Sequence, residues 1–208
     1  MLNKKAKFKQ ELSRKVIHLS SLWIPVLYYI SNFAVMLLVF SIITPVFVAC
    51  DILRHRKTRL GRKVRLFCTA LRLDNIFRLH EKRGGISGAS YMLISALICL
   101  IIFPKPIFII AFVVLMIADS AAALIGMRFG ISKVVGSKTF LGTMAFFGVS
   151  GVIAIVLSYN FGLDMRHAVF AAGITTIAEM LSEKLKVDDN LLIPLVFGFW
   201  YMLIRVII

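Results

Sequence analysis

Long apolar runs recur along almost the whole chain and constrain its fold more than any other feature of the sequence. A run of about 18 residues or more has the length that an α-helix needs to cross the hydrocarbon core of a bilayer. Hydrophobic residues make up 60% of the chain, whereas roughly 45–50% is typical of soluble domains. The sequence therefore predicts an all-α, polytopic integral membrane protein.

About seven stretches fit a transmembrane helix, and short polar or proline-containing segments separate them. The predicted spans are Val16–Ile30, Phe33–Leu53, Ser87–Phe103, Ile107–Met127, Phe140–Tyr159, His167–Leu181 and Leu191–Ile208. The first span is short and contains Pro25, and the sixth contains Glu179. At this length the spans leave no room for a separate soluble domain, so we expect residues 1–208 to form a single membrane-embedded domain.

The basic residues are distributed unevenly over this topology. With a cytosolic N-terminus, the cytosolic side carries 22 of the 25 Lys and Arg residues, and 11 of them lie in a basic loop at about residues 54–86. Lys105, Arg166 and Arg205 are the three that fall elsewhere. Because cytosolic loops of membrane proteins are rich in Lys and Arg, this asymmetry favours both the number of spans and the orientation. It also accounts for the formal charge of +15, so we expect no nucleic-acid partner.

The basic loop also contains apolar residues at helical spacing. Leu60, Val64, Phe67 and Leu71 recur every three to four residues among arginines, which is typical of a helix that lies on a membrane surface. We expect this segment to contact anionic lipid headgroups. The three cysteines follow no disulfide or zinc-binding pattern.

Four polar residues share one face of the first helix where it enters the bilayer. Glu11, Arg14, Lys15 and His18 stand at positions i, i+3, i+4 and i+7, which places them on one side of an α-helix. Such a stripe is typical either of ion-paired residues at the membrane surface or of residues that bind a charged substrate.

Asp119 lies within the fourth predicted span, where a carboxylate must be paired, protonated or bound to a cation. Small residues continue along its helix face, namely Ala122, Ala123, Gly126 and Gly130. They favour the close approach of another helix or of a nucleotide.

A glycine-rich loop, residues 130–142, follows this helix and contains Lys138, Thr139 and Gly142. Backbone N–H groups and a lysine in such a loop can bind phosphate. The spacing is not that of a Walker A loop, and the flanking segments are transmembrane helices.

Further acids lie near the cytosolic end of the sixth span and in the loop after it. Glu179 is followed by Asp188, Asp189 and Asn190, whose oxygens are the hard ligands that magnesium prefers. The same three residues would also suit the N-terminus of the last helix. Acids, bases and glycines thus converge at one membrane face, which favours phosphoryl or nucleotidyl transfer to a membrane lipid.

The order of these motifs resembles that of the CTP-dependent lipid-alcohol kinases, including dolichol, phytol and farnesol kinases and the fungal CTP-using diacylglycerol kinase. The matching residues are Glu11-x-x-Arg14-Lys15-x-x-His18, Gly88-Ala-Ser-Tyr91, Asp119-x-x-Ala122-x-x-x-Gly126-x-x-x-Gly130, Lys138-Thr139-x-x-Gly142, Glu179, Asp189-Asn190 and Pro194. They cover almost the whole chain. The family's motif usually reads Lys-Lys-Thr-x-Glu-Gly, whereas Ser137 and Leu141 replace its first Lys and its Glu here.

The resemblance implies a membrane enzyme, with its active site on the cytosolic face, that transfers the γ-phosphate of CTP to the hydroxyl of a lipid alcohol. It implies Mg²⁺ as cofactor. The residues to which it gives roles are Asp119, Lys138, Glu179 and His18 in catalysis, Arg14, Lys15, Gly126, Gly130, Thr139 and Gly142 in nucleotide binding, and Asp119, Asp188, Asp189 and Asn190 at the metal. The base stays open between His18 and Glu179.

Two alternatives remain open on the sequence. The CDP-diacylglycerol synthases share the nucleotide motif, although their C-terminal signature is absent, so a cytidylyltransferase is one alternative. A small transporter that uses Asp119 and Glu179 as ion sites is the other. The sequence predicts neither the particular lipid alcohol nor the oligomeric state.

Overall fold

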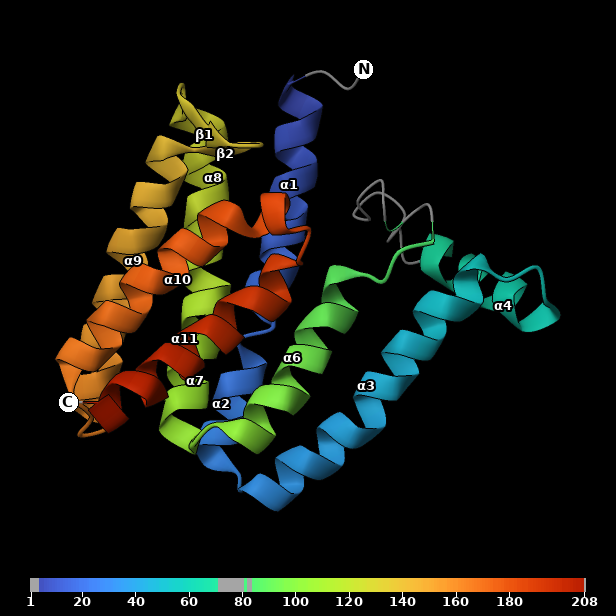
Figure 1. The fold of residues 1–208 in the computed structure, drawn as a ribbon. Helices are drawn as coiled ribbons and strands as arrows, with labels where there is room; N and C mark the ends of the chain where they lie inside the picture. Colours follow the sequence, from blue (N-terminus) through green and yellow to red (C-terminus); the bar gives the residue numbers. More distant parts are fainter. Residues whose placement is uncertain (1–3, 71–80, 82–83, 208) are drawn as a thin grey trace.

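The computed structural model describes residues 4–70, 81 and 84–207 and is almost entirely helical. Its elements are α1 (Lys4–Ser20), α2 (Trp23–Ile30), α3 (Phe33–His55), α4 (Arg59–Ala70), α6 (Gly88–Ile102), α7 (Lys105–Val113), the π-helical turn η2 (Val114–Ala118), α8 (Asp119–Phe129), β1 (Lys133–Val135), β2 (Lys138–Thr139), α9 (Phe140–Asn160), α10 (Met165–Leu185) and α11 (Asp189–Ile207). Figure 1 shows a helical bundle with α3 set at one side and α4 across the end of α3.

Within the described part of the chain, four helices are long and apolar enough to cross a membrane. They are Phe33–His55, Lys105–Phe129, Phe140–Asn160 and Asp189–Ile207. The other predicted spans also fall on helices, since α6 is a shorter apolar helix and α10 contains the whole of the sixth span. The prediction of an all-α protein with membrane-spanning helices is confirmed at this level.

The first predicted span is not continuous, which corrects the prediction of one helix over Val16–Ile30. Helix α1 ends at Ser20 and α2 begins at Trp23. The Ser20 hydroxyl bonds back to the Ile17 carbonyl (2.6 Å). Pro25 lies in the first turn of α2, where a missing N–H costs no helical hydrogen bond. The polar stripe therefore occupies a separate helix, α1, in front of the short apolar helix α2.

The continuous helix formed by α7, η2 and α8 is the centre of the bundle. In its most apolar window 72% of the residues are buried, compared with 17% in α3. Phe108 and Phe112 stack at a centroid distance of 4.5 Å, and Tyr28 of α2 meets Phe108 edge-on at 5.0 Å. The apolar side chains on the outer face of α3 are exposed, as expected of a helix that faces lipid.

Helix α4 confirms that the basic loop contains a helix. Gly61 lies so close to the Leu53 and Arg56 carbonyl oxygens that no side chain would fit there, so α4 turns back tightly from the end of α3. Leu60 and Phe67 are exposed. Leu71, the fourth residue of the predicted apolar stripe, lies outside the described residues, as does much of the remaining loop.

The glycine-rich loop after α8 forms a short antiparallel hairpin, which we did not predict. Lys133 pairs with Thr139 and Val135 with Lys138. The β-branched pair Val134-Val135 favours a strand, and Gly136 adopts a φ of 57° in the turn, which suits glycine.

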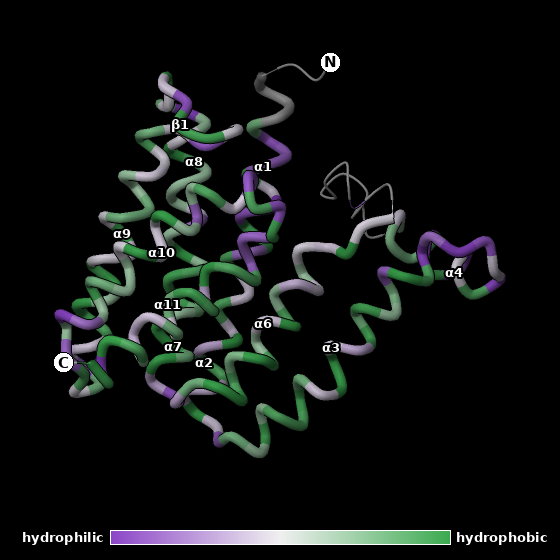
Figure 2. Tube along the Cα trace, viewed as in Figure 1, coloured by the Kyte–Doolittle hydropathy of each residue, from purple (hydrophilic) through white to green (hydrophobic). Residues whose placement is uncertain are grey.

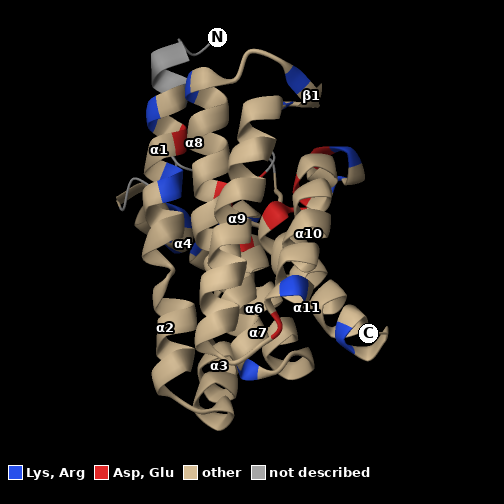
Figure 3. Cartoon of the chain, turned by 90° about the vertical axis from the view of Figure 1, so that its left-hand side faces the viewer, with Lys and Arg blue, Asp and Glu red and all other residues tan. Residues whose placement is uncertain are grey.

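Charged residues gather at one end of the bundle. Figure 2 shows hydrophilic residues on α1, α4 and the hairpin, and Figure 3 shows most of the Lys, Arg, Asp and Glu residues in the same half of the molecule. The opposite end contains the α2–α3, α6–α7 and α9–α10 turns.

Candidate functional site

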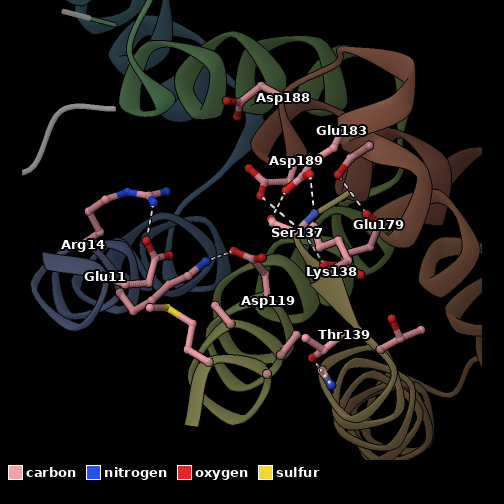
Figure 4. A pocket seen from close by; sticks show the side chains of 18 of the residues that line it. Glu11, Arg14, Asp119, Ser137, Lys138, Thr139, Glu179, Glu183, Asp188 and Asp189 are labelled. Atoms are coloured by element: carbon pink, nitrogen blue, oxygen red, sulfur yellow. Dashed lines mark hydrogen bonds and ion pairs between the residues drawn. The ribbon is translucent and has the colours of Figure 1, made fainter. Parts of the chain in front are cut away.

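A cavity of about 720 Å³ lies at the charged end of the bundle and is lined by residues from seven segments. Helix α1 contributes Glu11, Arg14 and Lys15, α8 contributes residues from Asp119 onward, and the hairpin contributes its turn and second strand. The first turn of α9, the last turns of α10 and the α10–α11 turn complete the wall, and Tyr91 of α6 lies at its edge. Segments far apart in sequence thus meet around one space (Figure 4).

Most of the predicted site residues line this cavity. They are Arg14, Lys15, Asp119, Gly126, Lys138, Thr139, Gly142, Glu179, Asp188 and Asp189. His18, Gly130 and Asn190 are not among the lining residues.

Asp119 lies deep in the site and is paired. Asp119 is 2% exposed, and its carboxylate accepts a hydrogen bond from the buried ammonium of Lys15, which reaches it from α1. The π-helical turn η2 ends directly before Asp119, and such turns occur frequently at functional sites. The ion pair offsets part of the large cost of placing a carboxylate among apolar helices.

His18 lies behind this ion pair. Its Nε2 atom is 3.6 Å from Asp119 Oδ2 and 3.2 Å from the Leu115 carbonyl oxygen. A carbonyl oxygen only accepts hydrogen bonds, so Nε2 carries the proton in this contact. The imidazole therefore supports Asp119 from the side away from the cavity.

Lys138 and Glu179 form the second buried pair of the site. The Lys138 ammonium bonds to Glu179 Oε1 and lies 4.0 Å from Asp189 Oδ2. Burial alone would lower the pKa of Lys138, but the carboxylates of Glu179, Asp189 and Asp119 raise it well above its ordinary value. Lys138 therefore stays positively charged throughout the neutral pH range.

Two residues that line the cavity each have a buried oxygen atom with no hydrogen-bond partner within the described part of the chain. The atoms are Glu179 Oε2 and Thr143 Oγ1. Buried polar atoms are nearly always satisfied in folded proteins, so atoms of this kind beside a cavity are suited to a ligand or to water.

The hairpin is fastened to α10 by a residue that we did not predict. Glu183 accepts hydrogen bonds from the Ser137 backbone N–H (2.8 Å) and from its hydroxyl. The Ser137 N–H belongs to the loop expected to bind phosphate, and here it donates to a carboxylate. Glu183 follows Glu179 by four residues, so the shared helix face was the signal that could have identified it.

The predicted glycines allow close packing at the cavity wall. A Cβ atom at Gly126 would lie 2.8 Å from Thr139 Oγ1, and one at Gly142 would lie 2.9 Å from the Ala122 carbonyl oxygen. Thr139 also begins α9, because its hydroxyl accepts a hydrogen bond from the Gly142 N–H (3.2 Å). These contacts hold α8 against α9 and fix the position of the hairpin beside Asp119.

The remaining predicted residues pair locally. Arg14 bonds to Glu11 on α1. Asp188 accepts hydrogen bonds from the Asn190 backbone N–H (3.0 Å) and side-chain amide (2.7 Å), so this turn begins α11 in the way a helix cap does. Asp189 is left facing the cavity near Lys138.

The lining residues suit an anion that binds together with a hard cation. Six of them are acids, namely Glu11, Asp119, Glu179, Glu183, Asp188 and Asp189, and four are bases, namely Arg14, Lys15, Lys138 and Lys186. Among the described residues, no group of three or more His, Cys, Asp and Glu side chains is arranged to hold a metal ion. Mg²⁺ commonly uses one or two carboxylates together with substrate phosphates and water, and these oxygen donors fit that requirement.

Sequence comparisons find two similar proteins. The chain is 32% identical over 193 residues to the uncharacterized protein RP860 of Rickettsia prowazekii. The aligned segment covers 90% of this chain and 91% of that protein. It is 33% identical over 121 residues to the uncharacterized protein MJ1137 of Methanocaldococcus jannaschii, covering 57% of this chain and 59% of that protein. No family model and no solved structure matches the sequence.

Proposed function

The chain belongs to the family of the uncharacterized Rickettsia prowazekii protein RP860, and we propose that it is a membrane-bound kinase that phosphorylates a lipid alcohol. The phosphate donor is a nucleoside triphosphate, CTP by the resemblance of the motifs. One observation carries the proposal: buried carboxylates and a charged lysine from α8, α10 and the hairpin face one cavity at the polar end of an apolar bundle.

The proposed topology has seven membrane crossings and a cytosolic N-terminus. The gathering of charged residues at one end of the bundle supports it (Figure 3), because basic residues favour the cytosolic side. Helix α4 then lies on the cytosolic membrane surface, with its exposed Leu60 and Phe67 in the interface and its arginines at anionic headgroups. The cavity opens on this side, where nucleotides are available.

Lys138 and the acids around it form the phosphate-binding part of the site. Asp119 and Asp189 would hold Mg²⁺, which would neutralise charge on the phosphates, and Asp188 assists from the same turn. The permanently charged Lys138 exchanges part of its contact with Glu179 and Asp189 for the phosphates. Phosphoryl transfer depends mainly on such positioning and electrostatic stabilisation.

The reaction joins the hydroxyl oxygen of the lipid to the γ-phosphorus. The bond from the γ-phosphorus to the bridging oxygen of the β-phosphate breaks, and a nucleoside diphosphate leaves. Glu179 takes the hydroxyl proton, because this residue lines the cavity and its Oε2 atom has no partner among the described residues. His18 is a weaker candidate for the base, since it does not line the cavity.

The surroundings of the cavity suit a lipid acceptor. Ala122, Ala123 and Met127 of α8 line it on the apolar side. The adjacent first turn of α9 exposes Phe140 and Leu141 on the outer surface. An acceptor hydroxyl could thus reach the carboxylates while its hydrocarbon chain stays among apolar side chains.

The direct test is transfer by the purified protein. Labelled CTP and Mg²⁺ are supplied with a panel of lipid alcohols, including polyprenols, shorter isoprenoid alcohols and diacylglycerol. We expect a labelled lipid phosphate from at least one isoprenoid alcohol. The absence of product with every alcohol and every nucleoside triphosphate would overturn the proposal.

A further inference from the structure

Lys186 differs from the other cations of the cavity because it has no acidic partner within the described residues. Arg14, Lys15 and Lys138 each form an ion pair with a carboxylate of the same cavity. Lys186 also lines the cavity, but it is exposed, so it belongs to the rim and not to the buried floor.

Lys186 also occupies a backbone position that favours glycine. It follows the end of α10 with φ 56° and ψ 31°, and among the described residues it is the one non-glycine with a positive φ. Its N–H bonds to the Glu183 carbonyl (3.3 Å), and the next N–H, that of Val187, bonds to the Ser182 carbonyl (3.2 Å). This pair of bonds defines a Schellman motif, whose left-handed residue is most often glycine because a Cβ is unfavourable there.

From these two observations we infer that Lys186 binds an anionic phosphate of the substrate at the rim of the cavity. This inference rests on the proposed function. Asp119 and Glu179 lie at the buried floor, where the transferred phosphate would react. Lys186 therefore meets a phosphate that is not transferred, nearer the nucleoside. A glycine would suit the backbone better at this position, whereas the lysine supplies the charge that this contact needs.

The experiment measures binding and stability separately in the full-length protein, held in nanodiscs of zwitterionic lipid. The ligands are CTP and inorganic tripolyphosphate, each with Mg²⁺, and cytidine serves as the uncharged comparison. The variants are Lys186→Gly, which removes the charge and relaxes the backbone, and Lys186→Arg, which keeps the charge. Lys184→Ala is the matched control, because it removes one nearby charge from a residue that does not line the cavity.

We expect the unfolding temperature of Lys186→Gly to be no lower than that of the wild type, and to exceed it by as much as about 2 °C or more. Its Kd for CTP and for tripolyphosphate should be about fivefold to tenfold higher than that of the wild type. As salt is added, the Kd of this variant should rise less steeply than the Kd of the wild type. Lys186→Arg should stay within about twofold of the wild type, since it keeps the charge. Lys184→Ala should bind as the wild type does.

Unchanged binding by Lys186→Gly, or an equal loss in Lys184→Ala, would overturn the inference and leave the proposed kinase intact. A wild-type protein that binds neither CTP nor tripolyphosphate would overturn the proposed function together with the inference. The two failures are therefore distinguishable.

Discussion

The Asp119–Lys15 pair combines a proposed catalytic role with a structural one at single residues. Both side chains are almost fully buried, and each neutralises the other. Removing one partner of such a pair leaves an uncompensated charge in a low-dielectric environment, which typically costs about 3–5 kcal/mol. A single substitution at Asp119 therefore cannot separate a role in phosphate transfer from a role in folding.

A double substitution separates the two roles. We expect Asp119→Asn alone to be inactive and less stable than the wild type, and Lys15→Met alone to be destabilised as well. The combined variant carries neither charge, so it should recover most of the thermal stability in detergent while remaining inactive. Wild-type activity in the combined variant would show that the two residues serve only to pair with each other.

The choice of base gives a second prediction for single residues. Glu179→Gln keeps an oxygen for Lys138 but cannot take a proton, so we expect kcat to fall about 100-fold or more. His18→Gln alters only the support behind Asp119 and should lower kcat by less than about tenfold. Steady-state kinetics at saturating CTP measure both. The reverse order of effects would assign the base to His18.

Site residues were predictable where the chemistry was unusual for its place in the sequence. Asp119 and Glu179 stood out as acids within apolar spans, and both line the cavity. Glu183 and Lys186 were missed because charged residues near the end of a helix are ordinary. The position of His18 behind Asp119, outside the cavity lining, depends on the angle between α1 and α8. Helical spacing within one segment does not determine that angle.

Among the structural elements, the β1–β2 hairpin controls the geometry of the cavity most directly. It brings Lys138 to Glu179 and is fastened to α10 through Ser137 and Glu183. Its turn depends on Gly136. A Cβ atom there would clash with the Glu183 carboxylate, and the positive φ is unfavourable for a residue with a side chain. The hairpin therefore has little tolerance for change at this residue.

We expect Gly136→Ala to raise the KM for CTP several-fold, because the hairpin must shift away from α10 and carry Lys138 with it. The control is Gly148→Ala in the middle of α9, where an added Cβ meets no atom within 4 Å. That variant should keep wild-type kinetics and be slightly more stable, as alanine favours a helix. Equal kinetics for both variants would mean that the hairpin does not position Lys138.

Most helices were predictable from the long apolar runs, and the elements that were missed have local causes. Each predicted span except the first corresponds to one helical segment, with ends that differ by a few residues. The break between α1 and α2 was missed because hydropathy continues across it, although serine side chains and Pro25 end one helix and begin the next. The hairpin was missed because its strands are two and three residues long, too short for an alternating pattern to be visible.

The separation of charge between the two ends of the bundle determines the proposed orientation of the whole molecule. Ile131, in the loop before the hairpin, is 94% exposed, and the side chain of Arg166, at the start of α10, is 85% exposed. The hairpin and the α9–α10 turn, next to which these residues stand in the sequence, lie at opposite ends of the bundle in Figure 1. Both residues are accessible enough to report which side of the membrane each end faces.

Single cysteines at these two positions, in a background without the three native cysteines, test the orientation. We expect a membrane-impermeant maleimide to label Ile131→Cys only from the cytosolic side and Arg166→Cys only from the opposite side. Sealed vesicles of both orientations provide the comparison, and labelling after solubilisation confirms that each cysteine is reactive. Labelling of Ile131→Cys from outside would place the cavity on the wrong side for cytosolic nucleotides.

The most direct measurement of the central claim follows the fate of two labels. CTP labelled at the γ-phosphate and CTP labelled at the α-phosphate are incubated in parallel with the purified protein, Mg²⁺ and a polyprenol or phosphatidate. A kinase attacks the γ-phosphorus, so we predict label from the γ position in lipid phosphate, with CDP as the other product. Chelation of Mg²⁺ should abolish transfer, and added Mg²⁺ should restore it. Label from the α position in the lipid, with release of pyrophosphate, would contradict the kinase and identify a cytidylyltransferase instead.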